Sequence, residues 1–303
     1  MELLKELCGI HAPSGEEKPV RDFLIEYFKK NKKLFDSEPE LIYGEEFQDC
    51  LLVRFGKPRT VIFAHMDSIG FTVRYDNQLV PIGGPAAENG FELKGEDSLG
   101  PIACKLKVSD DGHLFYDFGR GIDRGTSLTF ACNFIETEDF IQSCYLDNRL
   151  GIYNALKVAE TLKDGVIAFS CWEEHGGGTV PFLLKYCYDK YQIKKALISD
   201  ITWVTEGVRH GEGVAISMRD RNVPRREFID QIIEIAARHN IPFQLEVEGG
   251  GSSDGREIQQ SPYPVDWCFV GAPENNVHSP TETVHKADIA AMMELYQILM
   301  REL

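Results

Sequence analysis

The chain has 303 residues and a formal charge of −16, from 32 Lys and Arg against 48 Asp and Glu. With 43% hydrophobic and 26% charged residues, the composition excludes a disordered or fibrous protein and allows one large domain or two modest ones. The acidic balance argues against nucleic acid or an anionic membrane as the partner, because phosphate groups are bound by clustered Lys and Arg. The cysteines are scattered without a C-x-x-C motif, and no apolar run is long enough for a membrane span. We therefore expect a soluble, cytoplasmic protein with reduced cysteines.

The N-terminal part of the sequence predicts a helix followed by two buried strands. Ser14 to Glu17 has the pattern of a capping box, and apolar residues at helical spacing follow it, which predicts a helix over 14–31. Leu51 to Val53 and Val61 to Ala64 are short apolar runs typical of buried strands.

Residues 71–143 have a different texture, in which short alternating segments are broken by glycine-rich turns. This pattern is typical of hairpins and predicts a small β-rich, barrel-like domain. From Asp147 onward the helical and strand patterns alternate. Strands are expected at 166–172, 196–199, 243–247 and 265–270, and helices at about 150–162, 179–190, 228–237 and 286–300. The sequence therefore predicts an α/β fold, with a mainly parallel central sheet covered by helices on both faces. Residues 1–70 and 144–303 would form this domain, and residues 71–143 would be inserted into it.

Histidine and acidic residues follow several of the predicted strands. They are His65 and Asp67, then Asp147 at the start of a helix, Glu173 and Glu174, Asp200, and His278. Each alone is weak evidence, because strand ends often carry polar turn residues. Ligands of open α/β sheets bind beyond the carboxyl ends of the strands, where these residues are expected to meet. Together they match the nitrogen and oxygen ligands of zinc or a similar divalent ion.

Two pairs within this set suggest divided roles. Glu173 and Glu174 are adjacent, and neighbours in an extended chain point to opposite sides, so one can bind metal while the other acts as a general base. His65 and Asp67 are two residues apart and would lie on the same side. Asp67 can then accept the second ring N–H of His65 and fix its tautomer.

Five ordered motifs carry a resemblance to a known family. They are Ala64 to Phe71, Leu146 to Gly151, Glu173-Glu174, Asp200 to Thr202, and His278 to Glu282. This pattern resembles the glutamyl and tetrahedral aminopeptidases, a family of dinuclear metallopeptidases in which some relatives carry cellulase names. The match extends in order over nearly the whole chain, and Gly250 to Gly255 is similar to the family's Gly-Thr-Asp segment.

The resemblance implies a role for each candidate residue. His65 and Asp200 would bind one divalent metal ion, Glu174 and His278 would bind a second, and Asp147 would bridge them. Glu173 would be the general base and Asp67 would orient His65, and the Asp147–Asn148 peptide bond is expected to be cis.

The resemblance also implies zinc, with cobalt or manganese as alternatives, short peptides as substrates, and a homo-oligomer. A twelve-subunit particle is not implied, because the inserted domain looks shorter than usual. His175 and the glycines at 176–178 stand where members of the family carry Gly-x-Arg-Gly, so the role of this loop stays open.

Other functions remain as alternatives. Gly251 to Gly255 fits the G-x-S-x-G motif of serine hydrolases, with Ser253 as the nucleophile and Asp266 and His278 downstream. That arrangement leaves His65 and the paired glutamates without a purpose, and a two-carboxylate glycosidase leaves both histidines unexplained. A metal-dependent amidohydrolase or deacylase acting on non-peptide amides would use the same residues as the peptidase. A non-enzymatic relative that kept only the fold would need none of them.

Overall fold

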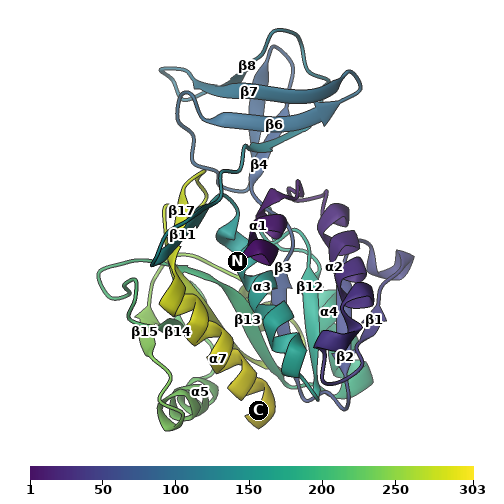
Figure 1. Cartoon of the computed structure of the whole chain (residues 1–303), viewed down its shortest axis with the longest axis vertical. Coiled ribbons are helices and arrows are strands. Elements are labelled where there is room, and N and C mark those ends of the chain that lie inside the picture. The colour runs from purple at the N-terminus through teal and green to yellow at the C-terminus, as the bar shows by residue number, and fades with distance from the viewer.

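The computed structural model describes residues 1–303 and divides into a large body built on an eleven-stranded sheet and a smaller closed barrel above it (Figure 1). Helices cover both faces of the sheet, which confirms the predicted fold class. None of the helices combines the length and the apolar character needed to cross a membrane. All the cysteines are free.

The centre of the sheet is parallel. Its strands, in spatial order, are β12 (Gly165–Ser170), β3 (Thr60–His65), β13 (Lys195–Trp203) and β16 (Asp266–Asn275). All residues of β3 and β12 are buried, as expected for apolar strands covered on both faces. The register pairs His65 with Ser170, which places the ends of these two strands side by side.

The edges of the sheet are mostly antiparallel. One edge is formed by β2 (Leu51–Phe55) and β1 (Glu40–Ile42), and the other by β17 (Glu282–His285), β11 (Phe140–Ser143) and β10 (Ile135–Glu136). A branch consists of β14 (Val214–Arg219), which pairs with β16, and β15 (Phe243–Val247), which pairs in parallel with β14. The sheet is therefore mixed, with its parallel part at the centre.

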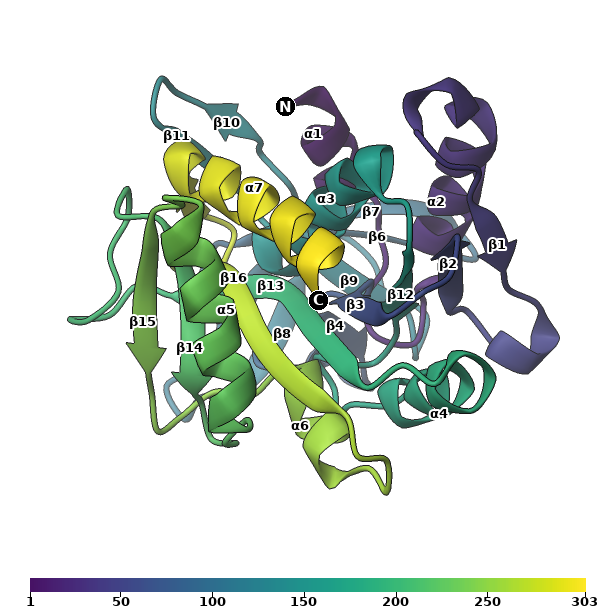
Figure 2. The same ribbon diagram turned by 90° about the horizontal axis from the view of Figure 1, so that it is seen from below.

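Two helices pack on each face of the central strands. On one face lie α3 (Leu146–Thr161) and α7 (Lys286–Glu302), and on the other lie α4 (Val180–Tyr191) and α6 (Asp254–Gln260) (Figure 2). The remaining helices are α1 (Glu2–Gly9), α2 (Lys18–Lys30) and α5 (Arg226–Arg238). The apolar faces of the helices and the sheet form one core of 69 buried residues, which holds the strand ends in fixed positions.

The helix predicted over 14–31 begins at Lys18, so the capping-box interpretation is wrong. The Ser14 hydroxyl donates to Asp67 at 2.6 Å instead of capping the helix, and proline occupies the first turn of α2. A proline is well accommodated there, because the first turn has no intrahelical use for its missing N–H. The Ser14 side chain therefore binds Asp67 at the sheet edge and does not cap the helix.

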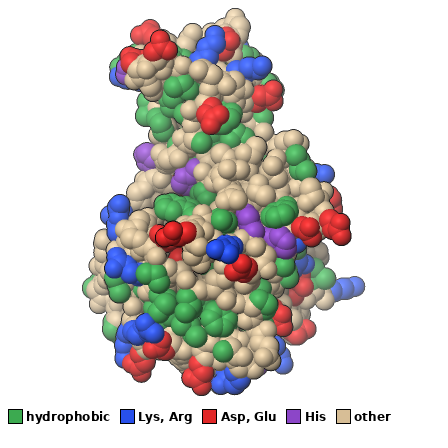
Figure 3. Space-filling view, turned by 90° about the vertical axis from the view of Figure 1, so that its left-hand side faces the viewer, with side chains coloured by type: hydrophobic (Ala, Val, Ile, Leu, Met, Phe, Trp, Pro, Cys, Tyr) green, Lys and Arg blue, Asp and Glu red, His purple; other side chains and the backbone are tan.

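The barrel has its own core and six antiparallel strands. In spatial order they are β4 (Gly70–Val73), β5 (Gln78–Ile82), β8 (Leu114–Asp117), β7 (Gly100–Val108), β6 (Glu92–Asp97) and β9 (Ser127–Phe130). The chain then returns to the large sheet through β10 and β11, so residues 135–143 pair there and not in the barrel. Figure 3 shows the barrel as a narrower body on the larger one, with charged side chains of both signs mixed over this face.

Candidate metal centre

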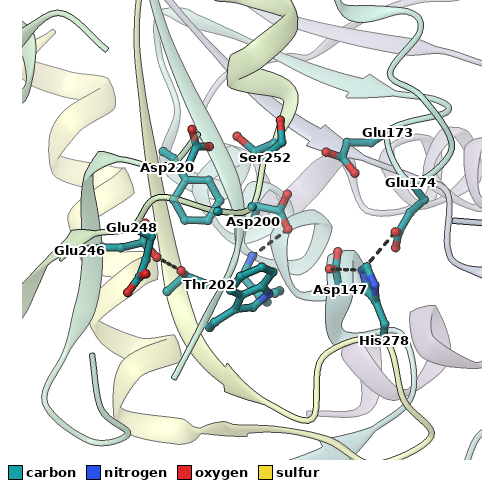
Figure 4. Close-up of a pocket in the computed structure, with 16 residues that line it drawn as sticks. Asp147, Glu173, Glu174, Asp200, Thr202, Asp220, Glu246, Glu248, Ser252 and His278 are labelled. Atoms are coloured by element: carbon teal, nitrogen blue, oxygen red, sulfur yellow. Dashed lines mark hydrogen bonds and ion pairs between the residues drawn. The ribbon is translucent and has the colours of Figure 1, made fainter. Parts of the chain in front are cut away.

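A cavity of about 250 Å³ opens at the carboxyl edge of the central strands (Figure 4). Five of the seven residues selected from the sequence line it: Asp147, Glu173, Glu174, Asp200 and His278. The other two, His65 and Asp67, are buried and contact these residues without lining the cavity themselves. The fold therefore brings all seven candidates together.

The possible metal-ligating side chains form two groups that share one residue. His65, Asp147 and Asp200 form one group, and Asp147, Glu174 and His278 form the other, with all ligand atoms of a group within 4.8 Å of one another. Asp147 directs Oδ1 toward His65 Nε2 at 3.1 Å and Oδ2 toward His278 Nε2 at 3.3 Å. The two oxygens of a single carboxylate thus face the two groups.

Each group is completed by a further carboxylate. Asp200 Oδ2 lies 3.5 Å from His65 Nε2 in the first group. Glu174 Oε2 lies 3.1 Å from His278 Nε2 in the second. The family resemblance implied the same grouping of these residues.

Local structure explains how α3 presents Asp147. The Asp147–Asn148 peptide bond is cis, as expected, and the Asn148 side chain donates to the carbonyl of Ser199 at 2.9 Å. A Cβ added to Gly151 would lie 2.1 Å from the same carbonyl oxygen, so a glycine is needed where α3 approaches β13. Asp200 lies within β13 and His65 ends β3, whereas both were expected just after their strands.

Asp67 connects several parts of the centre. Its Oδ1 lies 3.4 Å from His65 Nδ1, in agreement with the expected orienting contact. The same carboxylate accepts hydrogen bonds from the backbone amides of Glu173 and Glu174 at 3.1 and 3.0 Å. Burial alone would raise the pKa of Asp67, but the hydrogen bonds from His65, Ser14 and the Glu174 amide hold it below its usual value. Asp67 therefore stays ionised. It positions both the His65 ring and the segment that carries Glu173 and Glu174, which we call the glutamate loop.

The crowded carboxylates of the centre perturb one another. Burial, reinforced by repulsion from Asp147, raises the pKa of Glu174 to about 7 and that of Asp200 to about 6. Burial would lower the pKa of His278, but its contacts with Asp147 and Glu174 raise it to about 12. In the absence of other cations, protonated histidine supplies the positive charge that these carboxylates need.

The residues fit a divalent metal ion. Glu174 Oε1 is buried without a hydrogen-bond partner, which is unfavourable for a carboxylate oxygen unless a cation or a ligand contacts it. The available donors are imidazole nitrogens and carboxylate oxygens, which suit zinc and similar ions. Metal binding would also release the histidine protons, since an imidazole ligates in its neutral form.

Glu173 lines the cavity but belongs to neither ligand group. Burial raises the pKa of its carboxyl well above the usual value, and the nearby carboxylates of Asp254 and Glu174 add to this effect, while His65 opposes it. A carboxylate with a raised pKa is a stronger base, so Glu173 is suited to accept a proton in the cavity.

Three contacts at the centre were not anticipated. The buried Glu282 carboxylate accepts from the backbone amides of Asp147 at 3.2 Å and His278 at 3.0 Å. The buried Arg149 guanidinium donates to the carbonyl of Leu7 at 3.2 Å and to that of Met66. Glu282 and Arg149 lie inside motifs selected from the sequence, but spacing alone does not distinguish a supporting residue from a ligand.

The third contact comes from the barrel. The carbonyl of Gly84 lies 3.1 Å from His278 Nδ1 and can fix the orientation of that ring. The amide of the preceding Gly83 donates to His175 Nδ1 at 2.9 Å. In the sequence this glycine pair indicated only a turn, and its closeness to the centre depends on how the barrel is seated. His175 belongs to neither ligand group and ties its loop to the barrel.

The serine hydrolase alternative is not supported by the position of Ser253. Its side chain is buried and caps the start of α6, where it accepts from the amide of Gly255 at 3.2 Å. No histidine contacts its hydroxyl, and His278 is engaged by Asp147 and Glu174. The nucleophile and base of a serine hydrolase need to be within hydrogen-bonding reach of each other.

Comparisons with known proteins agree with the geometry. The profile of the M42 glutamyl aminopeptidase family matches residues 118–295. A protein of Acetivibrio thermocellus, provisionally named an aminopeptidase, is 27% identical over 97% of this chain and 96% of its own length.

Solved structures show the same fold. The aminopeptidase APDkam598 of Desulfurococcus kamchatkensis is 24% identical, covers 100% of this chain and 94% of its own, and superposes with a TM-score of 0.87. The TET1 peptidase of Pyrococcus horikoshii, which assembles into a tetrahedron or an octahedral shell, is 21% identical over 100% of this chain and 99% of its own, with a TM-score of 0.84. A Thermotoga maritima protein with an endoglucanase name is 20% identical over 98% of this chain and 96% of its own, with a TM-score of 0.74.

Proposed function

The chain belongs to the M42 family of glutamyl aminopeptidases, and on that premise we propose that it is a dinuclear metal-dependent aminopeptidase that removes N-terminal residues from short peptides. The observation that carries this proposal is the division of the Asp147 carboxylate between two groups of possible ligands. If only one metal ion were bound, the other group would keep buried carboxylates with perturbed pKa values and no metal ion to stabilise them.

In this proposal each group holds one divalent ion. His65 and Asp200 would hold one ion, Glu174 and His278 would hold the other, and Asp147 would be shared by both. Zinc fits the donor set best, with cobalt or manganese as alternatives, because imidazole and carboxylate ligands accept all three. When bound, such a pair of ions polarises the scissile carbonyl and lowers the pKa of water toward neutrality.

Glu173 performs the proton transfers. Its carboxylate removes a proton from the attacking water as the new C–O bond forms at the scissile carbonyl. The glutamic acid then returns this proton to the leaving nitrogen as the C–N bond breaks. Asp67 positions the base through its hydrogen bond to the Glu173 amide and orients His65 through the ring nitrogen.

The enzyme is also proposed to act as a homo-oligomer. The TET1 relative assembles into large closed particles, and the barrel by which the present chain departs from a simple α/β domain projects away from the sheet. Sedimentation of the purified protein tests this part, with a mass several times that of one chain as the expected result and a monomer as the contrary one.

The function is tested with paired substrates that differ only at the N-terminal amine. Aminoacyl amides with a free amine and the same compounds with an acetylated amine are incubated with zinc-loaded protein, with and without a chelator. We expect release from the free-amine substrates alone, abolished by the chelator and restored by zinc. Cleavage of acetylated substrates only would instead identify a deacylase, and activity that ignores the chelator would overturn the metal mechanism.

A further inference from the structure

The cavity extends beyond the proposed metal ligands. Asp220, Glu246 and Glu248 line its other side, across from Glu174 and His278 (Figure 4). They come from the branch of the sheet, where Glu246 lies in β15 and Asp220 directly follows β14. None of the three belongs to a group of possible metal ligands. We refer to these three carboxylates as the acidic end of the cavity.

The acidic end forms no ion pair within the protein. The lining of the cavity includes seven Asp and Glu residues but no Lys or Arg. Arg219 and Arg221 flank Asp220 in the sequence, yet neither forms an ion pair with it. The guanidinium of Arg219 donates to the backbone carbonyl of Asp220 at 3.1 Å, and Arg221 is exposed. A positively charged group of a ligand would therefore stabilise this end.

Glu246 is the most informative member of the acidic end. It is only 5% exposed, and one of its oxygens accepts a hydrogen bond from the hydroxyl of Thr202. The Ser217 hydroxyl also donates to this carboxylate, but no Lys, Arg or His lies within ion-pairing distance of it. A carboxylate that is buried at the wall of a cavity without a cation indicates a site built for a positively charged group.

The walls of the acidic end suit a long side chain. Trp203, which is 46% exposed, lies beside Gly250 and Gly251, where an added Cβ would approach the indole to 4.0 and 3.6 Å. The face of an indole attracts ammonium and guanidinium groups, and an apolar stem packs well against it. The acidic end thus combines negative charge with an aromatic surface.

We propose that the acidic end binds the cationic side chain of a lysine or arginine at the N-terminus of the substrate. The α-amine of that residue is one carbon away from the scissile carbonyl, so it must stay near Glu173, whereas the three carboxylates lie across the cavity and face the end of the side chain. This inference rests on the proposed aminopeptidase function and adds a preference for basic residues to it.

The test compares substrates of nearly equal shape and different charge. Arginyl and citrullinyl 7-amido-4-methylcoumarin are given to the zinc-loaded full-length protein, and lysyl and norleucyl compounds form a second pair. We expect kcat/KM for the charged member to exceed that for the neutral member by about 10- to 100-fold, the range for hydrogen bonds to charged groups. Equal values within both pairs would overturn the proposal.

Two variants connect this preference to the acidic end. Glu248→Gln removes a charge from a side chain without a hydrogen-bond partner, and we expect it to lower the arginine-to-citrulline ratio by about tenfold, mainly through KM. Glu234→Gln, on the exposed face of α5, is the matched control and should keep the wild-type ratio. A Glu248→Gln protein with an unchanged ratio, or one that has lost a bound zinc ion, would overturn the proposal.

The outcomes separate this inference from the proposed function. Efficient release from leucyl and citrullinyl substrates without a preference for arginine would leave the aminopeptidase intact and remove only the basic specificity. If no aminoacyl substrate is cleaved by the metal-loaded protein, the proposed function itself fails.

Discussion

Asp67 accepts a hydrogen bond from the backbone amide of Glu173 at 3.1 Å, and this contact joins the ends of β3 and β12. The same carboxylate accepts from the hydroxyl of Ser14 at 2.6 Å and faces Nδ1 of His65 at 3.4 Å. A single buried side chain thus positions both the proposed base and a proposed metal ligand. Even a conservative substitution of Asp67 should therefore have a large effect on catalysis.

Replacement of Asp67 by Asn tests this relationship. The Asn side chain has one NH2 group in place of an accepting oxygen, so at least one backbone amide of the glutamate loop loses its partner. We expect the free energy of unfolding to fall by roughly 1–3 kcal/mol, as measured by urea denaturation, with a clear loss of kcat. Ser14→Ala, which removes only one donor to Asp67, is the milder control and should cost about 1 kcal/mol. Wild-type kcat in the Asp67→Asn protein would show that the contact has no catalytic role.

Replacement of Glu173 by Gln tests the base. Gln keeps the shape of the side chain but cannot accept a proton, so we expect turnover to fall on the order of 10²- to 10⁴-fold. The zinc content should stay at the wild-type level, because Glu173 belongs to neither ligand group. Glu234→Gln serves again as the surface control. If the zinc-loaded Glu173→Gln protein kept wild-type turnover, the base would have to be another residue.

Removal of the metal should change how stability depends on pH. The pKa values of Glu174 and Asp200 are raised to about 7 and about 6 in the folded chain, so both groups bind protons more tightly there than in the unfolded chain. The contribution of these two groups to the stability of the folded chain is present at low pH and is lost as the pH rises through these pKa values. The raised pKa of His278 acts in the same direction above the unfolded value of 6.5.

We therefore expect the Tm of chelator-treated protein to fall when the pH is raised from about 5 to about 8. Zinc should oppose this fall, since it binds the deprotonated ligands of the folded chain and not the unfolded one. Differential scanning calorimetry with and without zinc provides the measurement. A metal-free Tm that rises over the same interval would contradict the account of the perturbed groups.

Glu282 is expected to hold the two ligand groups together. Its oxygens accept from the amides of Asp147 and His278, so Glu282→Gln turns an NH2 group toward one of these amides. We predict about a 10- to 100-fold loss of zinc affinity, the usual effect of losing a residue that supports a ligand. Competition with a chromogenic chelator measures this affinity. Unchanged zinc affinity in a folded Glu282→Gln protein would mean that the backbone at Asp147 and His278 keeps its position without the Glu282 carboxylate.

The sequence was most informative where residues able to bind metal follow an apolar run that predicts a buried strand. His65, Asp200 and the paired glutamates each stand at the end of an apolar run, and parallel strands deliver such residues to one edge because their register is fixed by burial. The alternating texture of the inserted segment likewise predicted a small β-rich body. These features depend on local sequence, so they can be predicted without knowing the packing.

Other features depend on how distant segments meet. Ser14 matches a capping box in the sequence, but Asp67 competes for its hydroxyl, and the helix starts at Lys18 as a result. The contact of Gly84 with His278 depends on the seating of the barrel. Strand β14 and helix α6 were missed because their sequences are short and weakly periodic, yet the neighbourhood of these elements forms one wall of the cavity.

Zinc stoichiometry tests the central claim most directly. Purified protein is stripped with a chelator, titrated calorimetrically with zinc, and compared with the variants His65→Ala and His278→Ala, each of which removes a ligand from one group only. The account predicts two zinc ions per chain in the wild type and the loss of one tight site in each variant, with the other site kept. A wild type that binds only one ion per chain, or a His278→Ala protein that still binds two with unchanged affinity, would contradict it.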